Sequence, residues 1–157
     1  MSDTPTIRAQ RHGPIIRQAV ATAVTAAFEG RELRWGECDC AILAQAAAGP
    51  LGHDLDLARF GNYRNLRSAW RALKADGLEN TDGILDAAGL PRIAPARALV
   101  ADIIGLGMPG EMISLGVYLG GQKILLFEPR LERCARFMPG PPVEGQIHIA
   151  WSLEART

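Results

Sequence analysis

The chain has 157 residues with 17 basic and 17 acidic side chains, and 48% of it is apolar. That length suits one domain with a real core, and the zero net charge argues against broad electrostatic binding to nucleic acid or to anionic lipid. No apolar run approaches the ~20 residues of a membrane-spanning helix, the polar start lacks a secretory signal, and three cysteines are too few for a disulfide scaffold. We therefore expect no nucleic-acid or membrane partner, and synthesis in a reducing cytoplasm without a signal peptide.

The amino-terminal part predicts an arm followed by a helix. Residues 1–13 are polar and show no periodicity, so we expect a flexible arm before a single domain at 14–157. Pro14 occupies a favoured first helical position, Gly30 is a favoured stop, and apolar side chains recur at helical spacing between them. These signals predict an amphipathic helix over 14–29.

The second predicted helix begins at a cysteine. Asp39 can cap this helix because its carboxylate can accept a hydrogen bond from a free backbone N–H, and residues 40–48 are good helix formers. The thiol of Cys40 then lies in the first turn, where the free N–H groups and the helix dipole favour an anion. Those conditions lower a cysteine pKa and produce the thiolate, which is the attacking species. Cys40 is therefore a candidate nucleophile.

The rest of the chain changes from helices to strands. Apolar spacing predicts a third helix that Gly77 stops, and Thr81 or Asp82 can cap a short fourth helix that reaches Ala88. Short segments rich in β-branched or aromatic residues then predict strands at 99–104, 112–119, 123–127, 135–137 and 147–151. Helices first and strands second indicate an α+β domain, with the helices packed on a small antiparallel sheet or barrel over 98–152.

Three motifs occur in a telling order: Asp39-Cys40 at a helix start, Ala101-Asp102-Ile103-Ile104, and Leu115-Gly116-Val117-Tyr118-Leu119-Gly120. They resemble the NlpC-type cysteine peptidases, papain-like enzymes that cut peptides in bacterial cell walls. Further features are similar to a branch of that family found beside phage and prophage tail genes: Trp35-Gly36, Gly61-Asn62-Tyr63 and the closing Ala150-Trp151. The resemblance extends over residues 15–152 and implies a papain-like, NlpC-type fold.

The resemblance assigns roles to positions of this chain. Cys40 corresponds to the nucleophile of the family and Ser114 to its base histidine, while the third polar position lies near the apolar Phe127. A thiol that attacks an amide needs an imidazole to take its proton and later to protonate the leaving amine. A serine hydroxyl cannot do this near neutral pH, so the expected base is missing.

The three histidines are the alternatives for a base. His12 lies in the polar amino-terminal segment, His53 follows the second helix in a loop, and His148 lies in the last predicted strand. Alternation places His148 on one face of that strand and its two isoleucine neighbours on the other. His148 is a relocated base if its face looks at Cys40. Otherwise it is a histidine on a solvated strand face or one bonded within the core, and both interpretations stay open.

Other candidate sites carry less chemistry. Cys38 and Cys40 with Cys134 lack the spacing of common zinc sites, so we expect no metal and no cofactor. Asp102 corresponds to a strand aspartate of the family that has a structural role. Trp35, beside the cysteine, and Asp39 are the candidates for a groove that receives a substrate or partner.

Two function classes follow from the resemblance. The first is a phage or prophage tail component near the baseplate or hub, located in the virion tail with other tail proteins as partners, that keeps the peptidase fold without its chemistry. The second is a cysteine peptidase or amidase that cuts peptidoglycan peptides during genome entry, with Cys40 as nucleophile. We favour the first, because loss of the base removes most of the nucleophilic advantage while the fold needs only its core.

Overall fold

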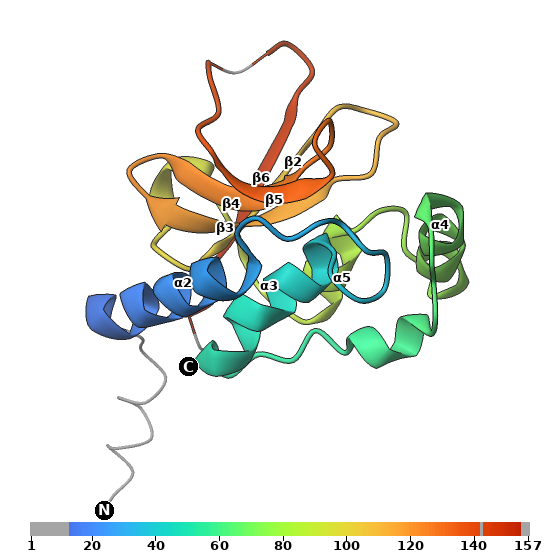
Figure 1. The fold of residues 1–157 in the computed structure, drawn as a ribbon, viewed down its shortest axis with the longest axis horizontal. Coiled ribbons are helices and arrows are strands. Elements are labelled where there is room, and N and C mark those ends of the chain that lie inside the picture. Colours follow the sequence, from blue (N-terminus) through green and yellow to red (C-terminus); the bar gives the residue numbers. More distant parts are fainter. Residues whose placement is uncertain (1–12, 142, 155–157) are drawn as a thin grey trace, which may run out of the picture.

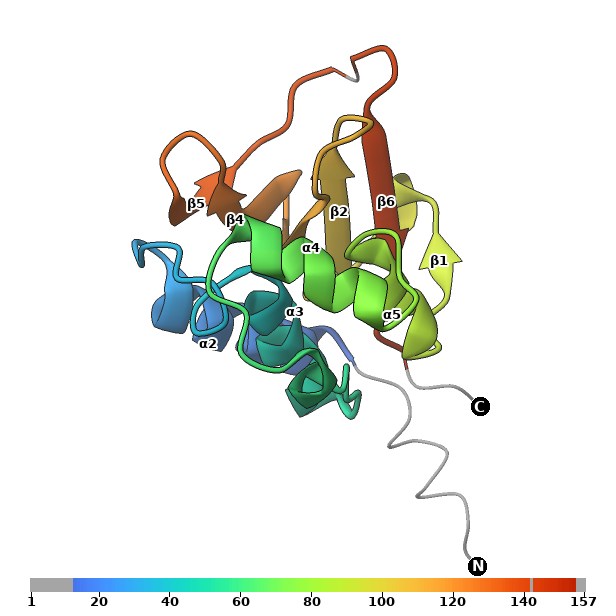
Figure 2. The ribbon, with the colours of Figure 1, turned by 90° about the vertical axis from the view of Figure 1, so that its right-hand side faces the viewer.

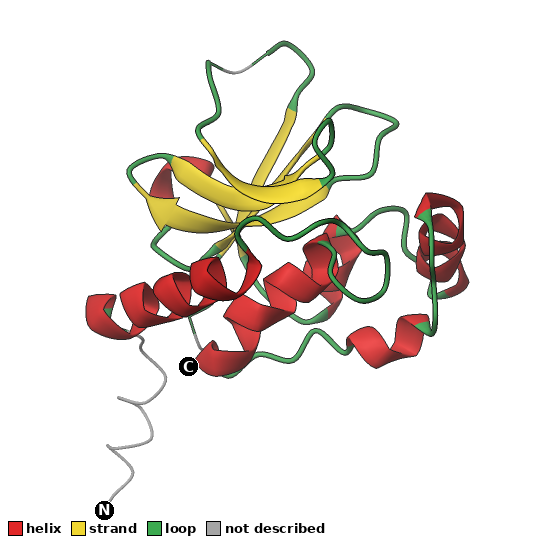
Figure 3. Cartoon of the chain, in the orientation of Figure 1, coloured by secondary structure: helices red, strands yellow, loops and turns green. Residues whose placement is uncertain are grey.

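The computed structural model describes residues 13–141 and 143–154 (Figure 1). Helices from the first half of the chain lie on one side of a six-stranded antiparallel sheet from the second half (Figures 1 and 3). The predicted α+β class is confirmed. The predicted arm, apart from Gly13, lies outside the described residues, and so does His12.

All four predicted helices are confirmed. They are α2 (Pro14–Phe28), α3 (Cys40–Ala48), α4 (Leu66–Ala75) and α5 (Asp82–Ala87), joined by the 3-10 turns η1 (Gly49–Leu51), η2 (Leu57–Phe60) and η3 (Pro95–Arg97). Pro14 is the first residue of α2, and Gly30 beyond its end has a φ of +88° that favours glycine. No helix in the described part of the chain is long and apolar enough to cross a membrane.

The sheet is open and wholly antiparallel. Its strands are β1 (Arg92–Ile93), β2 (Ile103–Gly107), β3 (Ser114–Gly120), β4 (Lys123–Glu128), β5 (Arg133–Phe137) and β6 (Ile147–Trp151), in the order β1-β6-β2-β3-β4-β5. The barrel alternative is therefore not formed. The last strand along the chain lies inside the sheet, between the first two (Figure 2).

One strand prediction is partly wrong. Residues 99–102 form a turn, and β2 begins only at Ile103. The Asp102 carboxylate accepts a hydrogen bond from the Leu99 N–H at 2.8 Å, and Ala101 between them has a φ of +78°. The aspartate closes the turn on itself, which overrides the β-branched composition of this segment.

Side-chain alternation gives the sheet two apolar faces. The helix-covered face holds Ile103, Leu115, Val117, Leu125 and Trp151, which pack with α3 residues such as Leu43 and Ala44. The opposite face holds a second cluster made of Ile104, Leu106, Ile124, Leu126 and Ala150. Any side chain of a strand can therefore be assigned to one of two sides from its parity.

Asp102 joins three parts of the chain at a buried point. Its Oδ1 accepts hydrogen bonds from Arg17 of α2 at 2.8 Å and from the Leu153 N–H at 2.9 Å. Arg17 is 2% exposed and Asp102 is 0% exposed, and Arg17 also contacts Glu154 at 3.1 Å. These contacts give Asp102 the structural role that the resemblance implies.

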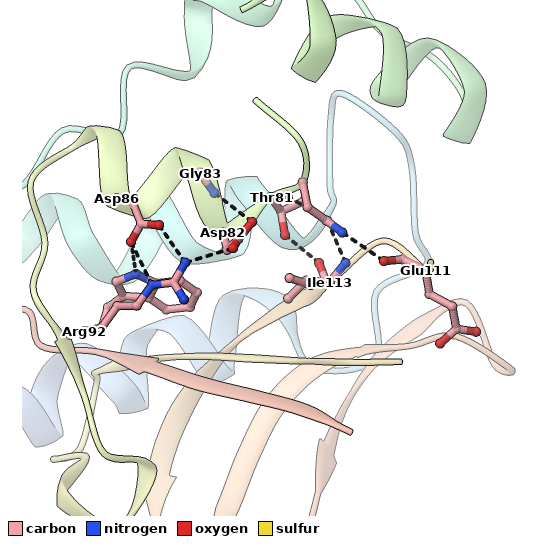
Figure 4. Close-up of polar contacts among 9 residues, drawn as sticks. Thr81, Asp82, Gly83, Asp86, Arg92, Glu111 and Ile113 are labelled. Carbon is pink, nitrogen blue, oxygen red and sulfur yellow. Dashed lines mark hydrogen bonds and ion pairs between the residues drawn. The ribbon is translucent and has the colours of Figure 1, made fainter. Parts of the chain in front are cut away.

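Helix α5 is fixed to the sheet by polar contacts (Figure 4). The Arg92 guanidinium of β1 lies 2.9 Å from Asp82 and 2.7 Å from Asp86. These hydrogen bonds from Arg92 hold the pKa of the Asp86 carboxyl below its usual value. The Thr81 hydroxyl donates to the carbonyl oxygen of Ile113 at 2.7 Å, so Thr81 anchors the start of α5 to the sheet rather than capping it with its side chain.

Candidate functional site

Asp39 organises the start of α3. Its Oδ1 accepts a hydrogen bond from the Ile42 N–H at 3.0 Å, as predicted for a helix cap. Its Oδ2 accepts one from the Gly36 N–H at 2.8 Å and one from the Tyr63 hydroxyl at 2.7 Å. The side chain is 1% exposed, and these three donors compensate its burial.

Cys40 is the first residue of α3, but its thiol is not activated. Burial raises the pKa of this thiol to about 12, and the neighbouring charge of Asp39 acts in the same direction. Hydrogen bonds from the backbone N–H groups of Leu115, Cys40 and Ala41 act the other way and are outweighed. The pKa lowering predicted from the helix terminus is therefore wrong, because desolvation disfavours the thiolate more than the first turn favours it.

The thiol borders a small apolar pocket. The pocket encloses about 350 Å³, part of it open to solvent. Its walls come from the loop before α3, from α3 itself, from η2 and α4, from α5 and from the β2–β3 loop. The lining residues are Trp35, Asp39, Cys40, Ala41, Phe60, Tyr63, Ala69, Ala72, Leu73, Thr81, Ile84 and Met112. The structure thus brings together Trp35, Asp39 and Cys40, the three positions that the sequence assigns to one site.

Tyr63 closes one side of this site. Its hydroxyl bond to Asp39 and its burial raise the pKa of the phenol. The backbone of Tyr63 also packs against Gly36, where an added Cβ would lie 2.5 Å from the Tyr63 carbonyl oxygen. Gly36 has a φ of +82°, so both its conformation and its neighbour require glycine.

The structure does not bring Ser114 and His148 to the thiol. Ser114 in β3 pairs with Leu106 in β2, and Leu106 pairs with His148 in β6. Leu106 belongs to the cluster on the face away from the helices, so both polar neighbours share that face. Cys40 packs on the opposite face. The relocated-base interpretation of His148 thus meets the wrong face of the sheet; its side chain is exposed, and partial burial lowers its pKa.

His53 is also remote from the thiol. Its backbone N–H donates to the Ala48 carbonyl oxygen at 3.0 Å, which places it at the carboxyl end of α3. That end is about 12 Å from Cys40 at 1.5 Å of rise per residue. The ring Nε2 lies 2.7 Å from the Leu153 carbonyl oxygen and is therefore engaged elsewhere. Of the two histidines in the described segments, neither serves Cys40.

The other two cysteines are core residues. Cys38 and Cys134 are each 1% exposed. Burial raises the pKa of Cys134 to about 12 and also raises that of Cys38. No group of three or more potential ligands suited to a metal occurs within residues 13–141 and 143–154.

Several residues of the site were not assigned to it from the sequence. Tyr63 was expected only as a core aromatic or as part of a family motif, whereas it bonds Asp39 and lines the pocket. Thr81 and Met112 line the pocket from positions far along the chain. Only the placement of Gly61-Asn62-Tyr63 before a helix was a usable signal, because long-range neighbours leave no local pattern.

The geometry defines a class of protein: an α+β domain in which a capped helix presents a buried cysteine to a sheet and a small apolar pocket. The sequence matches a family described as a domain of unknown function, DUF6950, over residues 15–139. The chain belongs to this family. No curated protein and no solved structure matches it.

Proposed function

We propose that this chain is a structural component of a phage or prophage tail, in the baseplate or hub region, built on an NlpC-type peptidase layout and without peptidase chemistry. Other tail proteins are its partners and the virion tail is its location in this proposal. The tail assignment rests on the sequence motifs around Trp35, Tyr63 and Trp151. The loss of chemistry rests on the site.

One observation carries the loss of chemistry. Neither His53 nor His148, the two histidines in the described residues, reaches the Cys40 thiol. Ser114, at the position of the family's base, lies on the other face of the sheet. Amide cleavage by a thiol requires a proton acceptor that later protonates the amine, and no side chain beside Cys40 in the described residues can fill both roles near neutral pH.

The electrostatics of the thiol support the same proposal. With a pKa of about 12, Cys40 is almost wholly protonated at neutral pH, so the attacking species is scarce. The carboxylate of Asp39, which lies next to the thiol in sequence, is committed to three hydrogen bonds. What remains of a peptidase layout is its framework.

The test compares chemistry with assembly. Purified wild-type protein and Cys40→Ala are incubated with peptidoglycan, and released peptides are measured by mass spectrometry. The same substitution and Cys134→Ala, a matched buried cysteine, are introduced into the phage, and tail assembly and infectivity are scored. We expect no peptide release, and normal tails from Cys40→Ala. Peptide release by the wild type that disappears in Cys40→Ala would establish the peptidase instead.

A further inference from the structure

One wall of the Cys40 pocket stands apart from the rest of the domain. Helix α4 lies at the edge of the molecule in Figure 1 and nearest the viewer in Figure 2, away from the sheet. Of its ten residues only Ala69 and Leu73 are buried, and Leu66 at its start is 47% exposed. The pocket lies between this helix and α3, so α4 lacks the close packing that fixes a core helix.

Two open glycines bracket this wall. Gly61 has a φ of +66° and Gly77 a φ of +81°, and at neither position does an added Cβ find an atom within 4 Å. The residues between them form the short segment that carries Tyr63, and then α4. Backbone rotation at such uncrowded glycines moves the segment without collision, as hinges in mobile loops require.

The wall has two polar fastenings within the described residues. The Tyr63 hydroxyl donates to Asp39 at 2.7 Å and joins the segment to the start of α3. Arg59 lies 3.2 Å from Asp76 and joins the far end of the segment to η2. The apolar contacts of Ala69 and Leu73 add to these. A unit held by so few interactions opens at a lower free energy than the sheet and α3.

We infer that residues 61–77 form a hinged lid over the Cys40 pocket, latched by the hydrogen bond between Tyr63 and Asp39. Opening the lid admits solvent and small molecules to the thiol while the sheet and the other helices keep their contacts. The inference concerns access to the pocket and holds whether or not the chain belongs to a tail or cleaves peptides.

The three cysteines provide a direct test in the intact protein. Methyl methanethiosulfonate, a small neutral reagent, is added at pH 8, and labelling of each cysteine is followed by fragmentation mass spectrometry at increasing urea concentrations below the unfolding transition. We expect Cys40 to react faster than Cys38 and Cys134, with a weaker dependence on urea, because lid opening exposes little surface. Tyr63→Phe should speed the labelling of Cys40 by about fivefold to tenfold, the size expected for one hydrogen bond, and leave the other two unchanged.

A matched control and the direction of the change make the result decisive. Tyr118→Phe removes a hydroxyl that accepts from the Gln122 N–H at 3.2 Å in the β3–β4 hairpin, and it should leave all three rates unchanged. If Tyr63 acted only by masking the charge of Asp39, its loss would raise the pKa of Cys40 further and slow the reaction. A slower or unchanged rate at Cys40, or equal acceleration at all three cysteines, overturns the lid. The peptidoglycan assay is unaffected by that outcome, so the two proposals fail separately.

Discussion

The Cys40 thiol experiences two opposing influences. The first turn of α3 supplies N–H groups that favour the thiolate, whereas burial and the charge of Asp39 favour the neutral thiol. The second set prevails because a thiolate excluded from water loses more solvation than a few N–H groups return. A cysteine at a helix start is therefore a nucleophile only where solvent or an imidazole accompanies it.

This raised pKa has a consequence for stability. The unfolded chain releases the Cys40 proton near its ordinary value of 9.0, while the folded chain holds it to about 12. Between these values the folded state binds more protons, so the free energy of unfolding falls as pH rises. Cys40→Ala lacks this contribution, and its stability should fall less steeply from pH 8 to pH 10.5.

Urea unfolding at both pH values checks this expectation. The quantity to compare is the change in unfolding free energy of each protein between the two conditions, which removes any constant effect of the substitution. Parallel changes in the wild type and in Cys40→Ala would mean that the thiol is as solvated in the fold as in the unfolded chain.

Sequence reasoning is most complete for single residues that act locally. The cap formed by Asp39 follows from residue type and position alone. The pKa of Cys40 does not, because it depends on how deeply the sheet and Asp39 enclose the sulfur. The same holds for His148: alternation separates it from its isoleucine neighbours, but only the packing of α3 decides which of the two faces meets Cys40.

At the scale of elements, the loop before α3 depends on one glycine. A Cβ at Gly36 would lie 2.5 Å from the Tyr63 carbonyl oxygen, in a backbone conformation that already disfavours other residues. Gly30 has a similar φ of +88° and no atom within 4 Å of an added Cβ. The two glycines therefore separate conformational strain from steric conflict.

Gly36→Ala should accordingly destabilise the protein more than Gly30→Ala. The backbone term alone costs about 1 kcal/mol at either position, and displacement of Tyr63 adds about 1–3 kcal/mol at Gly36. Urea unfolding of both variants measures the difference. Equal losses would show that the Tyr63 segment moves aside freely.

Most elements were predictable because their signals are local. Pro14 and Gly30 delimit α2, and glycine and apolar spacing delimit α4. Two errors in the strands share a cause. Asp102 turns a β-branched segment into a turn by bonding the Leu99 N–H, and the two-residue β1 exists only because β6 pairs with it. Neither interaction leaves a periodic pattern in the sequence.

At the scale of the molecule, Arg17 links the first helix to the sheet. It pairs with Asp102 in a site where both side chains are almost wholly buried. Arg17→Met removes the cation and leaves the carboxylate without its charge partner, which should cost about 3–5 kcal/mol. Arg136→Met breaks an ion pair with Glu29 whose side chains are 53% and 41% exposed, and it should cost about 1 kcal/mol or less.

Thermal or urea unfolding of these two variants tests the ranking. A small loss in Arg17→Met would mean that the N–H donors of Leu99 and Leu153 satisfy Asp102 without the guanidinium. The arrangement could not be predicted from the sequence, since the three segments that meet at Asp102 are far apart along the chain and only the sheet order brings them together.

The position of β6 constrains when the domain can fold during synthesis. Residues 147–151 fill the gap between β1 and β2, so the earlier strands cannot form a continuous sheet before the ribosome has released this last one. Until then β1 has no hydrogen-bonding neighbour, and the Leu153 N–H has not reached Asp102. Folding to completion is thus a post-translational event, and a nascent chain stalled before residue 147 exposes an unpaired edge of β2 to chaperones or to aggregation.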